Sequence, residues 1–78
     1  MAVSAFVLIQ TEVGRASDVA EACRLIEGVL EAHDVTGPYD VIAKCEAASV
    51  DSLGHLVVGA IQEIPGIART LTCPVVNL

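Results

Sequence analysis

The sequence is poor in aromatic residues and in positive charge. It contains one Tyr, one Phe and no Trp, and its four Lys and Arg residues face ten Asp and Glu, which gives a formal net charge of −6. Binding to a phosphate backbone depends on clustered Lys and Arg, so the composition argues against direct contact with nucleic acid. The shortage of aromatic side chains also argues against an enzyme that encloses its substrate between a sheet and helices.

No apolar run approaches the length of a membrane span. The longest, residues 5–9, is far shorter than the roughly 18 residues that a spanning helix needs, and the N-terminus lacks the charged region and cleavage site of a signal peptide. Cys23, Cys45 and Cys73 are widely spaced and form no CxxC pair, a pattern typical of reduced thiols that pack as small core residues. We therefore expect a cytoplasmic protein with no membrane contact, no metal and no cofactor.

Apolar residues, in contrast, are abundant. They make up 54% of the 78 residues, whereas a domain of this size buries only about 60% of the surface that its unfolded chain exposes. The length suits one domain, which we expect to span residues 1–78. One small core does not use all of this apolar surface, so the surplus indicates self-association.

The spacing of apolar residues predicts four strands and two helices. The strands are expected at residues 3–10, 30–36, 39–46 and 67–76, and the helices at 18–28 and 50–64. This order is the split βαβ pattern of ferredoxin-like folds. We therefore expect an α+β fold, βαββαβ, with one four-stranded antiparallel sheet.

The expected ends of the helices follow from their polar residues and glycines. Ser17 or Asp18 is predicted to cap the first helix and Ser49 the second. The second helix has apolar residues at positions 53, 56, 57, 60, 61 and 64, which is helical spacing. It also contains Gly54 and Gly59, each costing about 1 kcal/mol relative to Ala, and we attribute them to close packing against a neighbour.

The first strand predicts how the apolar surplus is used. Right-handed crossovers place both helices on one face of the sheet. Residues 3–10 are apolar at consecutive positions, so this strand needs cover on both faces. A second copy packed sheet to sheet supplies that cover. We therefore predict a homodimer with the architecture of a dimeric α/β barrel.

Three segments carry a resemblance to a known family. They are Thr-Gly-Pro-Tyr-Asp at residues 36–40, Ile-Pro-Gly-Ile at 64–67 and Arg-Thr-Leu-Thr at 69–72. In this order they resemble the effector-binding (regulation of amino-acid metabolism, RAM) domain of the Lrp/AsnC family of feast/famine transcriptional regulators, over about residues 5–76. Family members also carry an N-terminal helix-turn-helix DNA-binding domain, which this sequence lacks, so the chain resembles a stand-alone sensor module.

The resemblance implies a sensing function without catalysis. The expected effector is an amino acid or a related small metabolite, held near the turn at residues 36–40 where dimers meet. The expected partners are a second copy, a further ring of dimers, and full-length Lrp/AsnC-type regulators. Two alternatives stay open, namely an adaptor or oligomerisation module without a small ligand, and a small dimeric α/β-barrel enzyme.

The candidate ligand-binding residues are Thr36, Gly37, Tyr39, Asp40 and Thr72. An amino acid presents an ammonium and a carboxylate, which call for an acidic group at one end and N–H or hydroxyl donors at the other. Asp40 and Asp34, which flank the turn, suit the ammonium. The backbone N–H groups of Tyr39 and Asp40, with the hydroxyl of Thr36 or Thr72, suit the carboxylate. The structural alternative is that Asp40 only caps the turn and that Tyr39 packs at its base.

Overall fold

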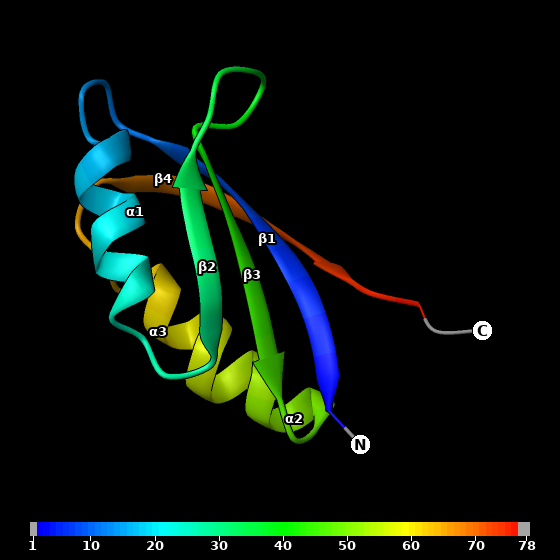
Figure 1. Cartoon of the computed structure of the whole chain (residues 1–78). Helices are drawn as coiled ribbons and strands as arrows, with labels where there is room; N and C mark the ends of the chain where they lie inside the picture. The colour runs from blue at the N-terminus through cyan, green and yellow to red at the C-terminus, as the bar shows by residue number, and fades with distance from the viewer. Residues whose placement is uncertain (1, 77–78) are drawn as a thin grey trace.

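A computed structural model describes residues 2–76 and shows the expected order of elements. These are β1 (Val3–Thr11), α1 (Ala16–Arg24), β2 (Val29–Asp34), β3 (Val41–Ala47), α2 (Val50–Ser52), the π-helical stretch η1 (Leu53–Val58), α3 (Gly59–Gln62) and β4 (Ile67–Pro74). The strands form one antiparallel sheet in the order β2-β3-β1-β4, and the helices lie against one side of it (Figure 1). The predicted ferredoxin-like α+β fold is confirmed.

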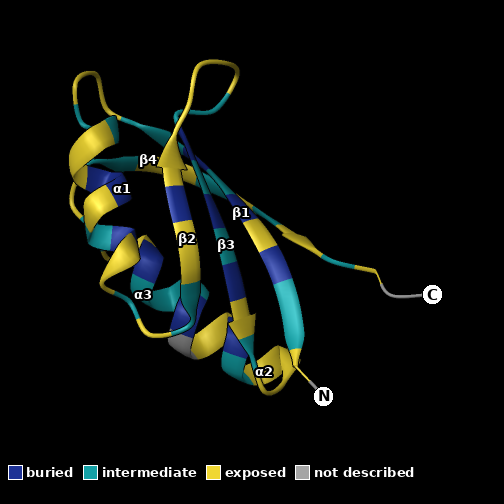
Figure 2. Cartoon of the chain, viewed as in Figure 1, coloured by how far each residue is buried: buried dark blue, intermediate teal, exposed yellow. Residues whose placement is uncertain are grey.

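The core lies between the sheet and the helices. Every second residue of β1, at Ala5, Val7 and Ile9, is fully buried there, and the buried residues of β3 alternate in the same way. Figure 2 shows this alternation along the strands. Two-residue periodicity is what a strand with one covered face requires. Within one chain β1 is therefore covered on one face only, and the cover of its other face by a second copy stays a prediction.

The other side of the sheet, which we call the open face, has no cover from the residues that the structure describes (Figure 1). At its centre Leu8 pairs with Ile42 of β3 and with Leu71 of β4, and Phe6 and Leu71 are 40% and 49% exposed. The strand register assigns to the open face Ser4, Phe6, Leu8, Gln10, Glu31, His33, Ile42, Lys44, Glu46, Arg69, Leu71 and Cys73. Cys73 was predicted to be a core residue, but it is exposed because it stands opposite Phe6 on this face.

Helix α1 begins earlier than the sequence indicated. Its N-cap is Arg15, without a side-chain cap, so the prediction of Ser17 or Asp18 is wrong. Arg15 packs against the turn at Gly66, where an added Cβ would lie 3.2 Å from its side chain, and its Nε lies 3.5 Å from Asp18 Oδ2. A contact between distant segments therefore fixes the start of α1.

The second helical segment begins where expected but is not one regular α-helix. Ser49 caps it, because its Oγ accepts a hydrogen bond from the N–H of Ser52 at 3.1 Å. The turns then widen into η1, and the N–H of Gly59 donates to the carbonyl of Gly54, five residues earlier. A Cβ at Gly54 would meet nothing within 4 Å, so packing within the described residues does not require that glycine.

The apolar series expected in this segment reaches the core at three positions. Leu53, Val57 and Ile61 are buried against the sheet. The side chain of Leu56, from the same series, lies outside the described residues. The helical layer is thus held to the sheet by residues of both η1 and α3.

Candidate functional site

The loop that contains the predicted site joins β2 to β3 at the end of the sheet where β1 leads into α1 (Figure 1). Its base is closed by a hydrogen bond from the N–H of Val35 to the carbonyl of Asp40 at 2.8 Å. The N–H of Asp40 donates to the carbonyl of Ile9, also at 2.8 Å, and Nε2 of Gln10 donates to the carbonyl of Pro38 at 3.1 Å. The loop is therefore fastened to β1.

The carboxylate of Asp40 strengthens the same junction. Its Oδ2 accepts a hydrogen bond from the backbone N–H of Thr11 at 2.8 Å, a short distance typical of a charged acceptor. The bond has a structural role, but it joins the loop to β1 and does not cap the turn itself, as the structural alternative had it. A carboxylate has about four acceptor positions, so this bond leaves room for a ligand at the second oxygen.

The remaining predicted residues divide into two groups. Thr36 and Gly37 are exposed, and Tyr39 is half-buried beside Asp40. Thr72 lies elsewhere, on the helix-covered side of β4 opposite Val7. From strand spacing and rise, its Cα is about 12 Å from that of Val41 at the base of the loop. The structure thus brings together the four loop residues and keeps Thr72 apart from them.

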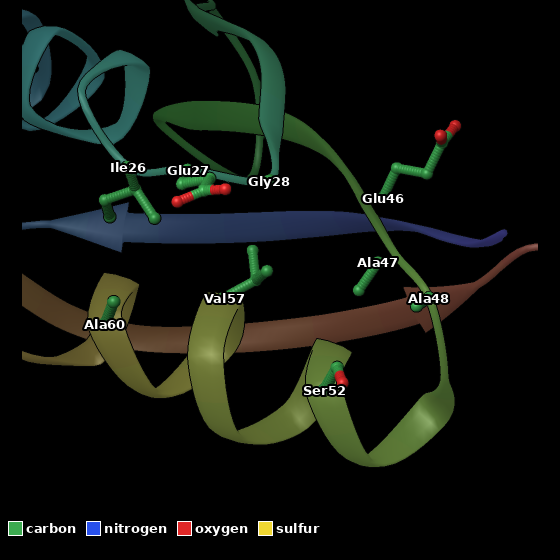
Figure 3. A pocket seen from close by; sticks show the side chains of 9 residues that line it. All are labelled: Ile26, Glu27, Gly28, Glu46, Ala47, Ala48, Ser52, Val57 and Ala60. Atoms are coloured by element: carbon green, nitrogen blue, oxygen red, sulfur yellow. The ribbon is translucent and has the colours of Figure 1, made fainter.

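A groove that the sequence did not predict lies at the opposite end of the sheet (Figure 3). Its volume is about 680 Å³, within the range of roughly 300–1,000 Å³ that small-molecule sites occupy. Three segments form it: the turn between α1 and β2, and, farther along the chain, the end of β3 and the helical layer that follows it. The lining residues are Ile26, Glu27, Gly28, Glu46, Ala47, Ala48, Ser52, Val57 and Ala60.

Gly28 determines how closely these segments approach. Its φ is +101°, and a Cβ there would lie 2.6 Å from Cγ2 of Val57 and 3.1 Å from the carbonyl oxygen of Glu46. The N–H of Glu46 also donates to the carbonyl of Gly28 at 2.8 Å. The one signal in the sequence was the glycine at the end of the expected helix over residues 18–28, since such a glycine marks either a helix end or a close approach.

The buried thiols have ordinary structural roles. Burial raises the pKa of Cys23, and it raises the pKa of Cys45 to about 11, with a smaller contribution from the neighbouring Cys23. A raised pKa keeps a thiol protonated and poorly reactive at neutral pH. Among residues 2–76, no three His, Cys, Asp or Glu side chains gather into a metal site. No helix in this part of the chain is long and apolar enough to cross a membrane.

Comparison with known proteins agrees with this fold. The model of the Lrp/AsnC ligand binding domain family matches residues 4–77. The uncharacterized HTH-type transcriptional regulator PF0250 of Pyrococcus furiosus is 36% identical over 72 residues, which are 88% of this chain and 48% of the relative. The chain belongs to the Lrp/AsnC ligand-binding domain family, a regulatory family, and the resemblance inferred from the three sequence segments is confirmed.

Solved structures extend the comparison. TTHA0845 from Thermus thermophilus superposes with a TM-score of 0.88 at 33% identity, covering 97% of this chain and 95% of that one. The feast or famine regulatory protein of M. tuberculosis, complexed with L-methionine, gives a TM-score of 0.77 at 26% identity, covering 97% and 51%. The chain spans less than half the length of the curated relatives that it matches.

Proposed function

We propose that this chain binds a small effector, an amino acid or a close relative, at the loop of residues 35–40 and acts by regulated assembly instead of catalysis. The observation that carries the proposal is the match of the Lrp/AsnC ligand binding domain to residues 4–77. The similar protein of M. tuberculosis that is complexed with L-methionine supports an amino acid as the ligand class.

The chemistry of the loop suits such a ligand. The second carboxylate oxygen of Asp40 is the acceptor for an ammonium group, while its first oxygen keeps the bond to Thr11. The exposed hydroxyl of Thr36 and the backbone at Gly37 and Tyr39 offer donors to a carboxylate. The loop is fastened to β1 at Pro38 and Asp40, so the Asp40 carboxylate is held in place before a ligand arrives, which lowers the entropic cost of binding. Thr72 is too distant to join them within one chain.

A thermal-shift panel of the proteinogenic amino acids tests this proposal. A ligand at about a hundred times its Kd adds about 2.7 kcal/mol of stability, which for a domain of this size raises Tm by about 10 °C or more. Asp40→Asn removes the charge but keeps an acceptor for Thr11, and we expect it to abolish the shift. Asp51→Asn, an exposed carboxylate in the first turn of α2, is the matched control and should bind as the wild type does.

We also propose that the open face pairs with the open face of a second copy. Its apolar centre, with exposed Phe6 and Leu71 around half-buried Leu8, is the kind of apolar patch that marks a protein interface. The same face would let the chain pair with full-length regulators of the family. Phe6→Lys should convert a dimer into a monomer in analytical ultracentrifugation, because it places a charge in that centre. Leu25→Lys, at an 88% exposed position after α1, should remain dimeric.

The two experiments separate the sensor from the adaptor alternative. If no amino acid shifts Tm and Phe6→Lys still dissociates the dimer, the ligand proposal is wrong and the chain is an assembly module without a small ligand. If the wild type is a monomer at micromolar concentration, the pairing proposal is wrong. Selective stabilisation that Asp40→Asn abolishes supports the sensor.

A further inference from the structure

We infer that the groove at the end of the sheet away from residues 35–40 is a second ligand site, and that it takes a small organic amine with an apolar body. This inference does not depend on the proposed effector site. It rests on the shape of the groove, the way its walls are fixed, and the charge at its rim.

The shape suits an apolar body. Most of the lining is hydrophobic or small, with Ile26, Ala47, Val57 and Ala60 among its residues. Figure 3 shows Val57 pointing from η1 toward the turn that carries Ile26 and Gly28. A concave surface of this composition, with few polar groups, is the usual form of a small-molecule site.

The walls are fixed without a ligand. The N–H of Glu46 is bonded to the carbonyl of Gly28, and Gly28 lies so close to Val57 that no other residue fits there without a shift. The third wall carries η1, and π-helical turns often occur at functional sites because they displace side chains from α-helical positions. The groove is therefore preformed, which favours binding.

The charge at the rim selects the head group. The only charged residues among the nine that line the groove are Glu27 and Glu46. Figure 3 shows Glu27 between Ile26 and Gly28, whereas Glu46 extends away from the other lining side chains, as its place on the open face requires. An ammonium group is attracted to Glu27 and a carboxylate is repelled. An amino acid, which carries both charges, should bind here more weakly than a simple amine.

A matched set of three small molecules tests the inference. 2-Phenylethylamine, 2-phenylethanol and 3-phenylpropionate share an aromatic body and differ in the charge of the head group. In an NMR titration of the full chain we expect the amine to give saturable shifts at the amides of Ile26, Gly28, Ala47 and Val57. The alcohol should bind more weakly, and the propionate should give no saturable shift.

Two variants and one control locate the site. Glu27→Gln should weaken amine binding about threefold, the size expected for a solvent-exposed ion pair, and Glu46→Gln should leave it unchanged. Ala60→Leu fills the groove and should abolish binding while the dispersed spectrum of the folded chain is kept. Asp40→Asn should have no effect, which separates this site from the proposed effector site.

The inference is wrong if the propionate binds as tightly as the amine, or if the shifts map to residues 35–40. It is equally wrong if the amine gives no saturable shift, or if Glu27→Gln and Glu46→Gln weaken binding to the same degree. Because Glu27 is exposed, its substitution leaves the fold intact, and the test therefore remains decisive even if Ala60→Leu does not fold.

Discussion

Gly28→Ala should destabilise this domain far more than an exposed glycine substitution normally does. Gly28 has a φ of +101°, and an added Cβ would lie 2.6 Å from Cγ2 of Val57, a buried side chain of η1. On its other side the carbonyl oxygen of Glu46 would be 3.1 Å away. Backbone lies on one side and a packed core residue on the other, so neither neighbour can move cheaply.

The magnitude follows from three contributions. A positive φ costs a residue with a Cβ about 1–2 kcal/mol, and forcing a methyl group into a packed site costs about 1–3 kcal/mol. The lower entropy of unfolded Ala returns about 0.4–1 kcal/mol. The net loss is about 3 kcal/mol, within limits of about 1–5 kcal/mol, and so a large part of the roughly 4–12 kcal/mol expected for 78 residues. A loss of about 3 kcal/mol corresponds to a fall in Tm of about 12–24 °C.

Urea unfolding at a fixed protomer concentration measures this loss, because self-association would otherwise change the apparent stability. Far-UV circular dichroism is the suitable signal, since the chain has no Trp. Gly14→Ala is the matched control, because Gly14 has a φ of +79° and a Cβ there would meet nothing within 4 Å. It should lose only the conformational part, about 1 kcal/mol.

Val57→Ala removes the atom that causes the clash and completes a double-mutant cycle. Its combination with Gly28→Ala should be less destabilising than the sum of the two single changes by about 1 kcal/mol or more. Equal losses for Gly28→Ala and Gly14→Ala, together with additive behaviour in the cycle, would refute the argument that the segments around the groove are in close contact.

Three further predictions concern other parts of the chain. In the same urea assay, Ser49→Ala should lower the free energy of unfolding by about 1 kcal/mol because it removes the cap of the second helix. Ser17 caps no helix, so Ser17→Ala should stay within about 0.5 kcal/mol of the wild type. Arg24→Met should cost about 1 kcal/mol, since it removes the hydrogen bond from Nε to the carbonyl of Ala32 at 2.9 Å; a loss no larger than that of Ser17→Ala would contradict this. Burial raises the pKa of Cys45 to about 11 from its usual 9.0, so this thiol keeps its proton to a higher pH in the folded state than in the unfolded state. The free energy of unfolding should therefore not depend on this thiol below pH 9 and should fall as the pH rises toward 11. In Cys45→Ala the fall over the same pH range should be smaller.

The sequence predicted the strands well because their signals are local. Apolar runs and the turn at Gly37-Pro38 placed three strands within two residues of their observed ends. Residues 30–36 alternate imperfectly and were assigned to a strand mainly because the segment is too short for a helix, and this strand too is placed within two residues. The start of α1 was wrong because the contact between Arg15 and Gly66 joins segments about fifty residues apart. The π-helical turns were missed because the apolar spacing around Gly54 and Gly59 fits an α-helix equally well.

The same holds for the candidate sites: residues that are neighbours in the sequence could be grouped from a motif, whereas contacts between separate segments could not be predicted. The loop residues Thr36 to Asp40 are neighbours in sequence, so a motif was enough to group them. Thr72 was added for its hydroxyl, and only the register of β4 reveals that it lies on the covered side of the sheet. The groove required the turn at Gly28 to meet β3 and the helical layer farther along the chain, and Gly28 alone does not identify the residues that it approaches.

The open face also resolves an apparent conflict between net charge and self-association. A chain with a net charge of −6 repels its own copies, and like charges held opposite one another weaken an interface. However, the open face carries two basic residues, Lys44 and Arg69, and two acidic ones, Glu31 and Glu46. It is therefore neutral, and all six net negative charges lie elsewhere. Two copies that pair through this face bring together its apolar centre and balanced charges, and the acidic surfaces stay turned toward water.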